Sequence, residues 1–251
     1  MMMKITDETL PIIVITCCIK PQISVSLGDA GVRLNQYHSS IDWWLNNTKV
    51  ILIIVENSGN IGLIKSRYTS KKYRQRMDFI GANAYSNCIL KGAGSLEASM
   101  TEQAIKLTRF NSIIRKLGFY KVTGRLTILN FNKIDKENSY KNPIISWWLA
   151  KGFLNVGRMD LRFFYFTYDF YIDKIIPINI FSDDRIGYWL ERVYVLPVIA
   201  NNHIIKAFPT YPRVSGIMAH TSHSYDGSIW IKWFVKNILY RMIKINKINK
   251  H

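Results

Sequence analysis

The sequence predicts an α/β protein whose mainly parallel sheet is flanked by helices, a Rossmann-type arrangement. Two buried β-branched runs, Leu10–Ile19 and Lys49–Val55, and a shorter strand, Met77–Ile80, alternate with segments of helical periodicity. Continuous apolar strands are typical of parallel sheets, which are covered on both faces. The connections are short, and the resulting β-α-β-α-β order favours crossovers within a single sheet.

Three helices are expected in the first half of the chain. Arg33–Asn46 has apolar residues at three- and four-residue steps, and Ile61–Arg74 is expected to form a second, short helix. A small-residue loop, Gly92–Gly94, precedes the third helix, Ser95–Leu107. Ser95 is the expected N-cap of that helix, because a serine hydroxyl accepts a hydrogen bond from a free backbone N–H of the first turn.

The later elements are less regular. Tyr120–Val122 and Leu126–Asn130 predict a strand region that is interrupted by Thr-Gly-Arg. Asp183–Val195 is expected to be helical and to end before Pro197, since proline breaks a helix interior. From residue 208 to 227 the chain is rich in proline, serine, glycine and histidine, which predicts a loop.

The composition indicates the class of binding partner and the cellular compartment. The 251 residues include 34 Lys and Arg against 17 Asp and Glu, a formal charge of +17, which favours an anionic partner: nucleic acid, an acidic membrane or a phosphorylated ligand. Cys17, Cys18 and Cys88 have the spacing of neither a disulfide framework nor a zinc site. The apolar stretch near the N-terminus is too short and too acidic for a signal peptide, and no run reaches the roughly 18 apolar residues of a membrane span. We therefore expect a cytoplasmic protein.

Two polar strings mark the ends of predicted strands, where open α/β sheets place their ligands. Val55–Gly59 follows the second strand and offers Glu56 and Asn57 as polar contacts. Asn-Ser-Gly is equally well explained as an ordinary turn. Lys121–Arg125 is the second string. An arginine beside glycine at a strand break is suited to clamping phosphate or carboxylate through its planar fork, although a surface arginine next to a turn has the same sequence.

The loop Lys91-Gly92-Ala93-Gly94 is a third candidate. Glycines allow a close approach of the backbone, and the start of the following helix supplies free N–H groups, so the loop suits a diphosphate or an acceptor sugar. An ordinary strand-to-helix loop is the alternative. The chain has no Asp-x-Asp pair to hold a divalent ion, and Asp183-Asp184 is adjacent rather than alternating. We therefore favour metal-independent chemistry, in which Arg125, with Lys121 and Arg162, supplies the positive charge; Mn²⁺ or Mg²⁺ stays an alternative.

A series of short motifs across residues 10–227 resembles bacterial glycosyltransferases encoded in capsule and O-antigen clusters. In order, the motifs are Arg33 with Gln36-Tyr37, Ser40-Ile41 and Trp44; Glu56-Asn57-Ser58-Gly59; Lys91-Gly92-x-Gly94-x-x-Glu97; Lys121-x-Thr123-Gly124-Arg125 with Asn130; Asp160-x-Arg162-Phe163-Phe164; Glu191; and Pro212-Arg213-x-Ser215-Gly216 with Ser224-Tyr225. The resemblance implies a GT-A-like fold and transfer of a sugar from a nucleotide donor, a CMP-sugar such as CMP-sialic acid or a UDP-sugar. The implied acceptor is a glycan, typically linked to undecaprenyl diphosphate.

Residue roles follow as expectations. Arg125 stabilises the leaving phosphate, and Glu97, then Asp160, then His220 are candidates for the base that deprotonates the acceptor hydroxyl. Glu97, one turn into its helix, is alternatively a solvated partner of the helix dipole. The residues expected to bind substrate or nucleotide are Thr16, Arg33, Glu56, Asn57, Ser58, Gly59, Lys91, Gly92, Gly94, Lys121, Thr123, Gly124, Arg162, Glu191, Arg213, Ser215 and Gly216.

The chain divides, on this interpretation, into a catalytic domain over residues 1–228 and a basic tail over 229–251. A polar stretch at Lys133–Asn142 separates a nucleotide-binding half, about 1–135, from an acceptor half, about 136–228, within one domain or at a boundary between two.

The tail places apolar residues on one helical face and lysines elsewhere, which is typical of an amphipathic helix on an anionic membrane or of a packing helix with a basic end. We expect a peripheral location on the inner face of the cytoplasmic membrane. The competing class is a basic nucleic-acid-binding protein without catalysis, but the basic residues are spread along the chain and no helix-turn-helix, zinc or RNP-like motif is present.

Overall fold

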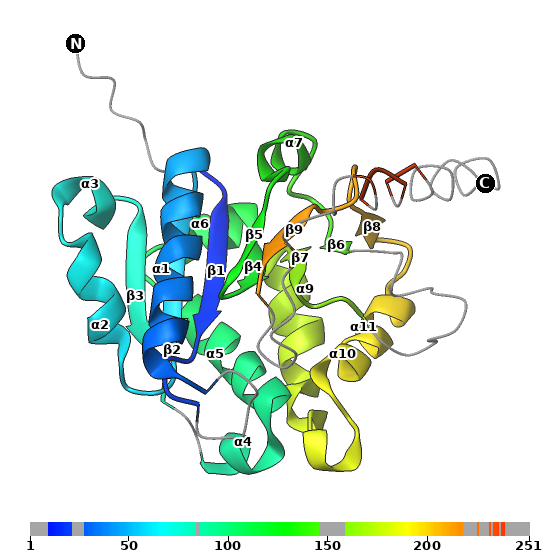
Figure 1. Cartoon of the computed structure of the whole chain (residues 1–251). Helices are drawn as coiled ribbons and strands as arrows, with labels where there is room; N and C mark the ends of the chain where they lie inside the picture. Colours follow the sequence, from blue (N-terminus) through cyan, green and yellow to red (C-terminus); the bar gives the residue numbers. More distant parts are fainter. Residues whose placement is uncertain are drawn as a thin grey trace.

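A seven-stranded mixed sheet forms the centre of the part of the chain that the structure describes (Figure 1). The structure is a computed structural model, and it describes residues 10–21, 28–83, 86–145, 159–217, 225, 231, 233–235 and 237–238. The strands are β1 (Ile12–Cys17), β2 (Ile51–Glu56), β3 (Met77–Gly81), β4 (Phe119–Thr123), β6 (Ile144–Ile145), β7 (Phe163–Phe166) and β8 (Lys206–Ala207). Their spatial order is β3-β2-β1-β4-β7-β6-β8.

The strands from β3 to β4 are parallel, as the sequence predicts, and the others make the sheet mixed. β1 pairs in parallel with both β2 and β4, while β7 is antiparallel to β4 and to β6. β1 and β2 are buried at every position, which explains their continuous apolar sequences. Because β4 pairs with β7, the sheet continues across the polar stretch near residue 135 and joins the two halves of the chain.

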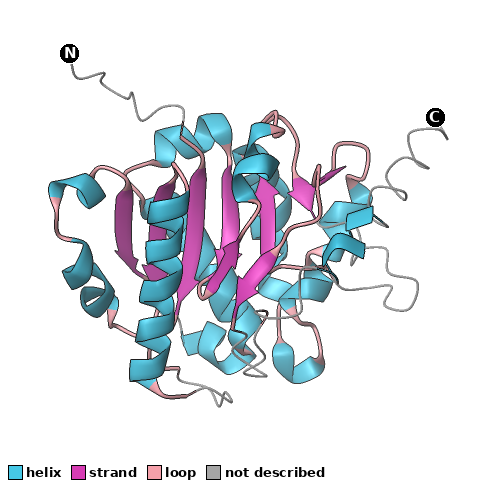
Figure 2. Ribbon diagram, turned by 45° about the horizontal axis from the view of Figure 1, so that its top comes forward, coloured by secondary structure: helices cyan, strands magenta, loops and turns pink. Residues whose placement is uncertain are grey.

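Helices cover both faces of the sheet (Figure 2). One face contacts α1 (Ala30–Asn47), α2 (Ile61–Lys65) and α7 (Phe131–Lys136). The other contacts α5 (Ala93–Leu107), α6 (Asn111–Leu117), α9 (Tyr168–Phe170), α10 (Leu190–Val193) and α11 (Val195–Ala200). Alternate residues of β1 supply the two cores: Ile13 and Ile15 pack with Trp44 of α1, whereas Ile12 and Val14 pack with Ala104 of α5. Among the described residues, no helix has both the length and the apolar character needed to cross a membrane.

Two helix starts differ from the prediction. α1 begins three residues earlier than expected, because the Asp29 carboxylate accepts a hydrogen bond of 2.7 Å from the N–H of Val32 and caps the helix. The N-cap of α5 is Gly92 and not Ser95, so the prediction of a serine cap is wrong. Ser95 lies in the first turn and is buried.

The predicted helix over residues 61–74 is broken into short pieces. α2 is followed by a 3-10 turn, Ser66–Tyr68, and then by α3 (Lys71–Arg74). Only Ile64 and Tyr68 of these elements are buried, so the segment lacks the continuous apolar stripe that would hold a longer helix against the sheet.

The segment 183–195 is also more irregular than predicted. Asp183 and Tyr188 form an isolated antiparallel bridge, and Gly187 between them takes a left-handed conformation with φ of 75°. α10 and α11 then follow in close succession. Pro197 does not end a helix: it is the third residue of α11, where the first turn needs no N–H donor.

The interrupted strand region divides between two sheets. β4 ends at Thr123, and β5 (Leu126–Ile128) pairs with β9 (Val214–Gly216) in a separate two-stranded sheet. β8 (Lys206–Ala207) precedes the region predicted to be a loop, and β9 lies inside it, so the prediction of a loop is wrong at residues 214–216; both strands are too short to give a periodic signal in the sequence. α4 (Ser86–Lys91) leads into the loop before α5.

Candidate functional site

The candidate site lies at the carboxyl ends of β1 and β4. From β1 the chain continues through α1 to β2 on one side, whereas β4 lies on the other side of β1. The strand order therefore reverses between β1 and β4, and open α/β sheets bind their ligands at such a reversal. Thr16 near the end of β1 is the register partner of Thr123 at the end of β4. Both belong to the residues predicted from the sequence.

Two glycines allow the backbone segments at this edge to approach closely. A Cβ on Gly124 would lie 2.1 Å from the carbonyl oxygen of Thr16 and 2.8 Å from a ring carbon of Tyr37. A Cβ on Gly216, whose φ is 117°, would lie 2.2 Å from the carbonyl oxygen of Arg125. Both positions therefore require glycine: Gly124 places the first turn after β4 against the end of β1, and Gly216 places β9 against the backbone of Arg125.

On the α5 side of the edge, one carboxylate oxygen of Glu97 accepts hydrogen bonds from three side-chain donors. Oε1 accepts hydrogen bonds from the hydroxyls of Thr16, at 3.3 Å, and Thr123, at 3.4 Å, and from the Lys121 ammonium. The ammonium also contacts the Leu161 carbonyl at 3.4 Å, and its side chain is only 2 % exposed. The Glu97 side chain is 28 % exposed, and no described residue donates to its Oε2. The carboxylate is thus fixed through one oxygen, and its side chain stays partly exposed.

On the α1 side of the edge, two arginines lie close together. Arg125 is 5 % exposed; it donates to Oε1 of Gln36 at 3.2 Å, and its guanidinium lies 5.9 Å from the centre of the Tyr37 ring. Arg33 is buried as well and donates to the Cys18 carbonyl at 2.7 Å and to the Tyr37 hydroxyl at 3.1 Å. Burial, together with the charge of Arg33, lowers the pKa of the Arg125 guanidinium.

No carboxylate of the described residues pairs with Arg125. A buried cation without an anionic partner is costly unless a ligand compensates it. The nearby thiol of Cys18 does not supply a negative charge near neutral pH, because burial raises its pKa to about 11. The α1 side of the site is therefore built to attract an anion.

Glu56 at the end of β2 is fully buried and holds the neighbouring loops together. Its Oε1 accepts from the N–H groups of Ile19, at 3.1 Å, and Ser58, at 2.9 Å, and from the Ser58 hydroxyl; its Oε2 accepts from the N–H of Asn60 at 2.7 Å. Protein donors therefore occupy both oxygens. The adjacent Asn57 is different, because its buried Oδ1 has no hydrogen-bond partner among the described residues.

The turn interpretation of this string is supported by Gly59, which has a φ of 75°. Within the string, Ser58 accepts a hydrogen bond of 3.0 Å from the N–H of Lys20 and so links the loops after β1 and β2.

The carboxylate of Asp184 lies against the glycine loop before α5. Asp184 accepts a hydrogen bond of 3.2 Å from the N–H of Gly94, and a Cβ on Gly92 would lie 2.5 Å from the Asp184 carboxylate. Lys91 donates to the carbonyl of Ile180 at 2.7 Å, so it ties the loop to the same distant segment. The closeness of Asp184 explains both glycines without a bound diphosphate.

Asp160 and Arg162 form an ion pair beside the Glu97 cluster. Two guanidinium nitrogens donate to the two Asp160 oxygens at 2.8 and 2.6 Å, and a third donates to the Tyr225 hydroxyl at 2.7 Å. The Arg162 carbonyl accepts from the N–H of Thr123 at 3.1 Å, which places the pair at the end of β4. Both oxygens of Asp160 are engaged, so Glu97 is the better placed of the two carboxylates to accept a proton from a ligand.

The remaining predicted residues lie around the edge or outside the described part. Glu191 is exposed on α10, and its carbonyl accepts from the N–H of Met159 at 2.8 Å. Arg213 has a buried Nε without a partner among the described residues, while its N–H donates to Asn130 at 2.8 Å. Ser215 lies opposite Thr127 in the small sheet. His220 lies outside the described residues.

Sequence reasoning assigned no role to Gln36 or Tyr37, although both contact the site arginines. Their positions three and four residues after Arg33 in one helix are the signal, because side chains at this spacing share a helix face. The contacts across the sheet edge, such as the Leu161 carbonyl on Lys121, have no signature in the sequence.

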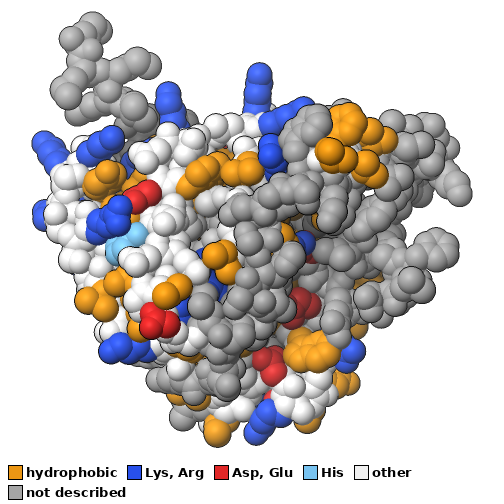
Figure 3. Space-filling model, viewed as in Figure 1, with side chains coloured by type: hydrophobic (Ala, Val, Ile, Leu, Met, Phe, Trp, Pro, Cys, Tyr) orange, Lys and Arg blue, Asp and Glu red, His pale blue; other side chains and the backbone are white. Residues whose placement is uncertain are grey.

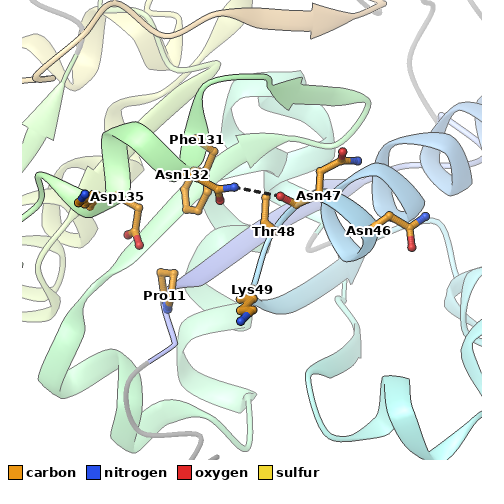
Figure 4. A pocket seen from close by; sticks show the side chains of 9 residues that line it. Pro11, Asn46, Asn47, Thr48, Lys49, Phe131, Asn132 and Asp135 are labelled. Carbon is orange, nitrogen blue, oxygen red and sulfur yellow. Dashed lines mark hydrogen bonds between the residues drawn. The ribbon is translucent and has the colours of Figure 1, made fainter.

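A separate pocket of about 400 Å³ opens at the amino edge of the sheet (Figure 4). It is lined by Pro11, Asn46, Asn47, Thr48, Lys49, Phe131, Asn132, Asp135 and Lys136. Asn132 reaches across it and donates to the Asn47 carbonyl at 3.0 Å. Pro11 and Lys49 precede β1 and β2, so the pocket is at the opposite edge from the clustered polar residues.

Within the described residues, no group of three or more His, Cys, Asp and Glu side chains is arranged to hold a metal ion. Comparison of the chain with models of protein families, with characterised proteins and with solved structures gave no match.

Proposed function

We propose that the protein is a GT-A-like glycosyltransferase that moves a sugar from a nucleotide-sugar donor to a glycan acceptor in bacterial surface polysaccharide synthesis. The donor is a CMP-sugar or a UDP-sugar, and the acceptor is linked to a lipid. The single observation that carries the proposal is the burial of Arg125 at the β1/β4 reversal without a carboxylate partner among the described residues.

Leaving-group stabilisation is the role for this arginine. Sugar transfer leaves a negative charge on the nucleotide phosphate, and fixed guanidinium groups stabilise such a charge through paired N–H donors. Gln36 and Tyr37 hold the Arg125 guanidinium in place, and Arg33 adds a second positive charge nearby. This arrangement supplies the charge that a divalent ion supplies in metal-dependent transferases.

Glu97 is the proposed base. A base must hold its oxygen within hydrogen-bond reach of the hydroxyl that it deprotonates. Lys121 and two threonines fix Oε1, and the partly exposed carboxylate leaves Oε2 for the acceptor hydroxyl. Glu97 and Arg125 approach the edge from opposite faces of the sheet, which suits an acceptor on the α5 side and a donor phosphate on the α1 side.

A peripheral location at the inner face of the cytoplasmic membrane is part of the proposal. Four residues at helical spacing are substantially exposed: Ile231 at 67 %, Phe234 at 46 %, Val235 at 49 % and Ile238 at 43 %. The side chain of Trp233, by contrast, donates to a carbonyl of the main fold at 2.8 Å. An apolar face turned to solvent supports the membrane interpretation of the tail over the packing interpretation.

A thermal-shift screen tests the donor site. The protein is melted with CMP, UDP, GDP and their sugar conjugates, each with and without Mn²⁺ or Mg²⁺. We expect one nucleotide to raise the melting temperature without metal, because a ligand that binds only the folded state stabilises it. Arg125→Lys should weaken the binding of that nucleotide at least about tenfold, since the variant loses charge-assisted hydrogen bonds to the phosphate.

Arg76→Lys is the matched control, because the Arg76 guanidinium likewise donates to neutral oxygens, the carbonyls of Thr48 and Leu45, but at the amino edge of the sheet. Equal binding by wild type and Arg125→Lys would refute the phosphate role. No response to any nucleotide, together with stabilisation by oligonucleotides, would favour a nucleic-acid-binding protein instead.

A further inference from the structure

The pocket at the amino edge of the sheet is separate from the candidate site. It lies where α1 and α7 end and where β1 and β2 begin, at the upper end of the view in Figure 1. We call it the amino-edge pocket. β1 has 6 residues and runs between the two edges, so the pocket lies about 20 Å from the carboxyl ends of the strands. Its volume of about 400 Å³ is in the range of sites that hold small molecules.

Hydrogen bonds fix the carboxylate of Asp135 in the wall of this pocket. The Tyr140 hydroxyl donates to Oδ1 of Asp135 at 2.6 Å. Tyr140 has a φ of 57°, and its N–H donates to Oδ1 of Asn138 at 2.8 Å. Among the described residues it is the one non-glycine residue with a positive φ, a conformation that costs free energy and often occurs at ligand sites. Asn138 in turn donates at 2.8 Å to the hydroxyl of Tyr120, which is buried on β4.

No cation of the described residues forms an ion pair with Asp135. Burial raises the pKa of its carboxyl group, and hydrogen bonds from Tyr140 and Tyr120 oppose that rise only in part. A partly buried carboxylate without a counter-ion is stabilised when a ligand donates hydrogen bonds to it. Figure 4 shows the carboxylate on the same side of the pocket as Pro11 and Phe131, whose buried side chains supply an apolar wall.

Two side-chain amides add both donors and acceptors to the pocket. Nδ2 of Asn132 donates to the Asn47 carbonyl at 3.0 Å (Figure 4), and Nδ2 of Asn47 donates to the Trp43 carbonyl at 2.8 Å. An amide has two N–H donors and an oxygen, and the described residues take one donor of each. Both side chains therefore retain a donor and an acceptor for a ligand.

The charges around the pocket favour a ligand without net charge. Asp135 and the carbonyl end of α1, a helix of 18 residues that ends at Asn47, disfavour an anion such as phosphate. Lys49 and Lys136 line the same pocket and are exposed, and they disfavour a cation. Figure 3 shows Lys and Arg side chains along the upper margin of the view, where this end of the molecule lies. Hydroxyl groups suit such a site, because each one donates and accepts without a charge.

We propose that the amino-edge pocket binds a neutral saccharide, whose hydroxyl groups form hydrogen bonds with Asp135, Asn47 and Asn132. A sugar ring also has an apolar face of C–H groups, which fits the wall formed by Pro11 and Phe131. In a glycosyltransferase, this second site holds a part of the glycan away from the transfer site. That role rests on the proposed function, but the binding itself is measured without any transfer activity.

Heteronuclear NMR of the full chain tests the inference. The side-chain amide signals of the pocket asparagines are followed while glucose, galactose, N-acetylglucosamine or lactose is added. Inorganic phosphate and spermidine are the charged comparison probes. The pocket variants are Asp135→Asn and Asn132→Leu, each close in size to the residue that it replaces. The controls, Asp173→Asn and Asn202→Leu, make the same changes at exposed positions outside the pocket.

We expect at least one saccharide to shift the signals of Asn47 and Asn132 in the wild type. Asp135→Asn should weaken its binding at least about fivefold, since a charge-assisted hydrogen bond becomes a neutral one. Asn132→Leu should weaken the binding as well, and both controls should retain the wild-type affinity. Melting temperatures close to that of the wild type show that each variant is folded.

The inference would be overturned if no saccharide shifted these signals, or if both pocket variants bound the saccharide as tightly as the wild type. Shifts caused by phosphate or spermidine alone would also overturn it, because the pocket would then bind a charged ligand. Failure of the nucleotide screen would overturn the proposed transferase and leave the saccharide result intact. A nucleotide response without saccharide binding would overturn the second site alone.

Discussion

Substitution of Gly124 by alanine is expected to strain the sheet edge on which the site depends. The new Cβ would lie 2.1 Å from the Thr16 carbonyl oxygen, a distance that real Cβ atoms essentially never show. Contacts below 3.0 Å have to be relieved by movement, so the backbone of β1 or of the turn has to shift by about 1 Å. The nearest obstructing atom, the Thr16 carbonyl oxygen, belongs to the backbone of the central parallel strand, so no side-chain rotation relieves this clash.

Overpacking of a well-packed core costs about 1–3 kcal/mol, and a clash with backbone favours the upper end of that range. For a chain of this size, about 3 kcal/mol lowers the melting temperature by roughly 6–12 °C. Urea unfolding followed by circular dichroism gives the free energy of unfolding directly. Gly62→Ala is the control, because a Cβ there meets nothing within 4 Å and Gly62 lies in α2. This change should leave stability equal or raise it by about 0.5–1 kcal/mol.

Equal free energies of unfolding for Gly124→Ala and Gly62→Ala would refute the predicted clash. A second readout concerns the site. Because the clash displaces the turn that carries Arg125 relative to the end of β1, the variant should lose the response to the nucleotide that stabilises the wild type, even at temperatures at which it is folded. A variant that is destabilised but binds the nucleotide normally would show that the edge tolerates the shift.

Three further changes test individual interactions. Lys121→Met should lower the free energy of unfolding in urea by about 2 kcal/mol, because it leaves the Glu97 carboxylate without its buried cation. The control, Lys106→Met, removes the exposed pair with Glu102 and should cost under about 0.5 kcal/mol. Equal losses of stability in the two variants would contradict the role of burial. Burial raises the pKa of the Asp135 carboxyl group, so between the unfolded and the folded pKa the folded chain retains a proton that the unfolded chain releases. The stability that the protonated Asp135 contributes is therefore lost as the pH rises from the unfolded pKa through the folded pKa. Asp135→Asn should therefore stabilise the protein at pH near 7, with the gain shrinking as the pH falls towards about 4 in thermal melts; a gain that does not change with pH would be contrary to this mechanism. Asp184→Ala removes the carboxylate at the start of α5 and should cost about 1 kcal/mol, whereas Asp173→Ala on an exposed position should cost nothing measurable; equal melting temperatures for the two variants would disprove the capping role.

The sequence predicts those parts of the fold that local pattern controls. The buried runs at β1 and β2 identify parallel strands, because a strand covered on both faces is apolar at every position. Local pattern fails where the deciding partner is distant in the chain. The start of α5 is set by Asp184, about ninety positions later, and so Ser95 is not its cap. The separation of β5 from β4 likewise depends on β9, which is too short to be recognised.

The same distinction explains what could be predicted of the site. A strand that ends in polar and small residues predicts that these residues lie at the carboxyl edge of the sheet, and Thr123 and Arg125 are found there. The state of each side chain follows instead from its partners. Glu56 and Arg125 are both buried polar residues at strand ends, yet backbone donors occupy both oxygens of Glu56.

The difference between these two residues is the reason that we propose a ligand role for Arg125 and not for Glu56. A carboxylate saturated by N–H groups is stable in the protein alone, and its removal would leave several donors unsatisfied. A buried guanidinium held by one amide and one aromatic ring retains donors and a charge, and both are satisfied when an anion binds. The contacts thus fit a scaffolding role for Glu56, and it is Arg125 to which we propose that a substrate phosphate binds.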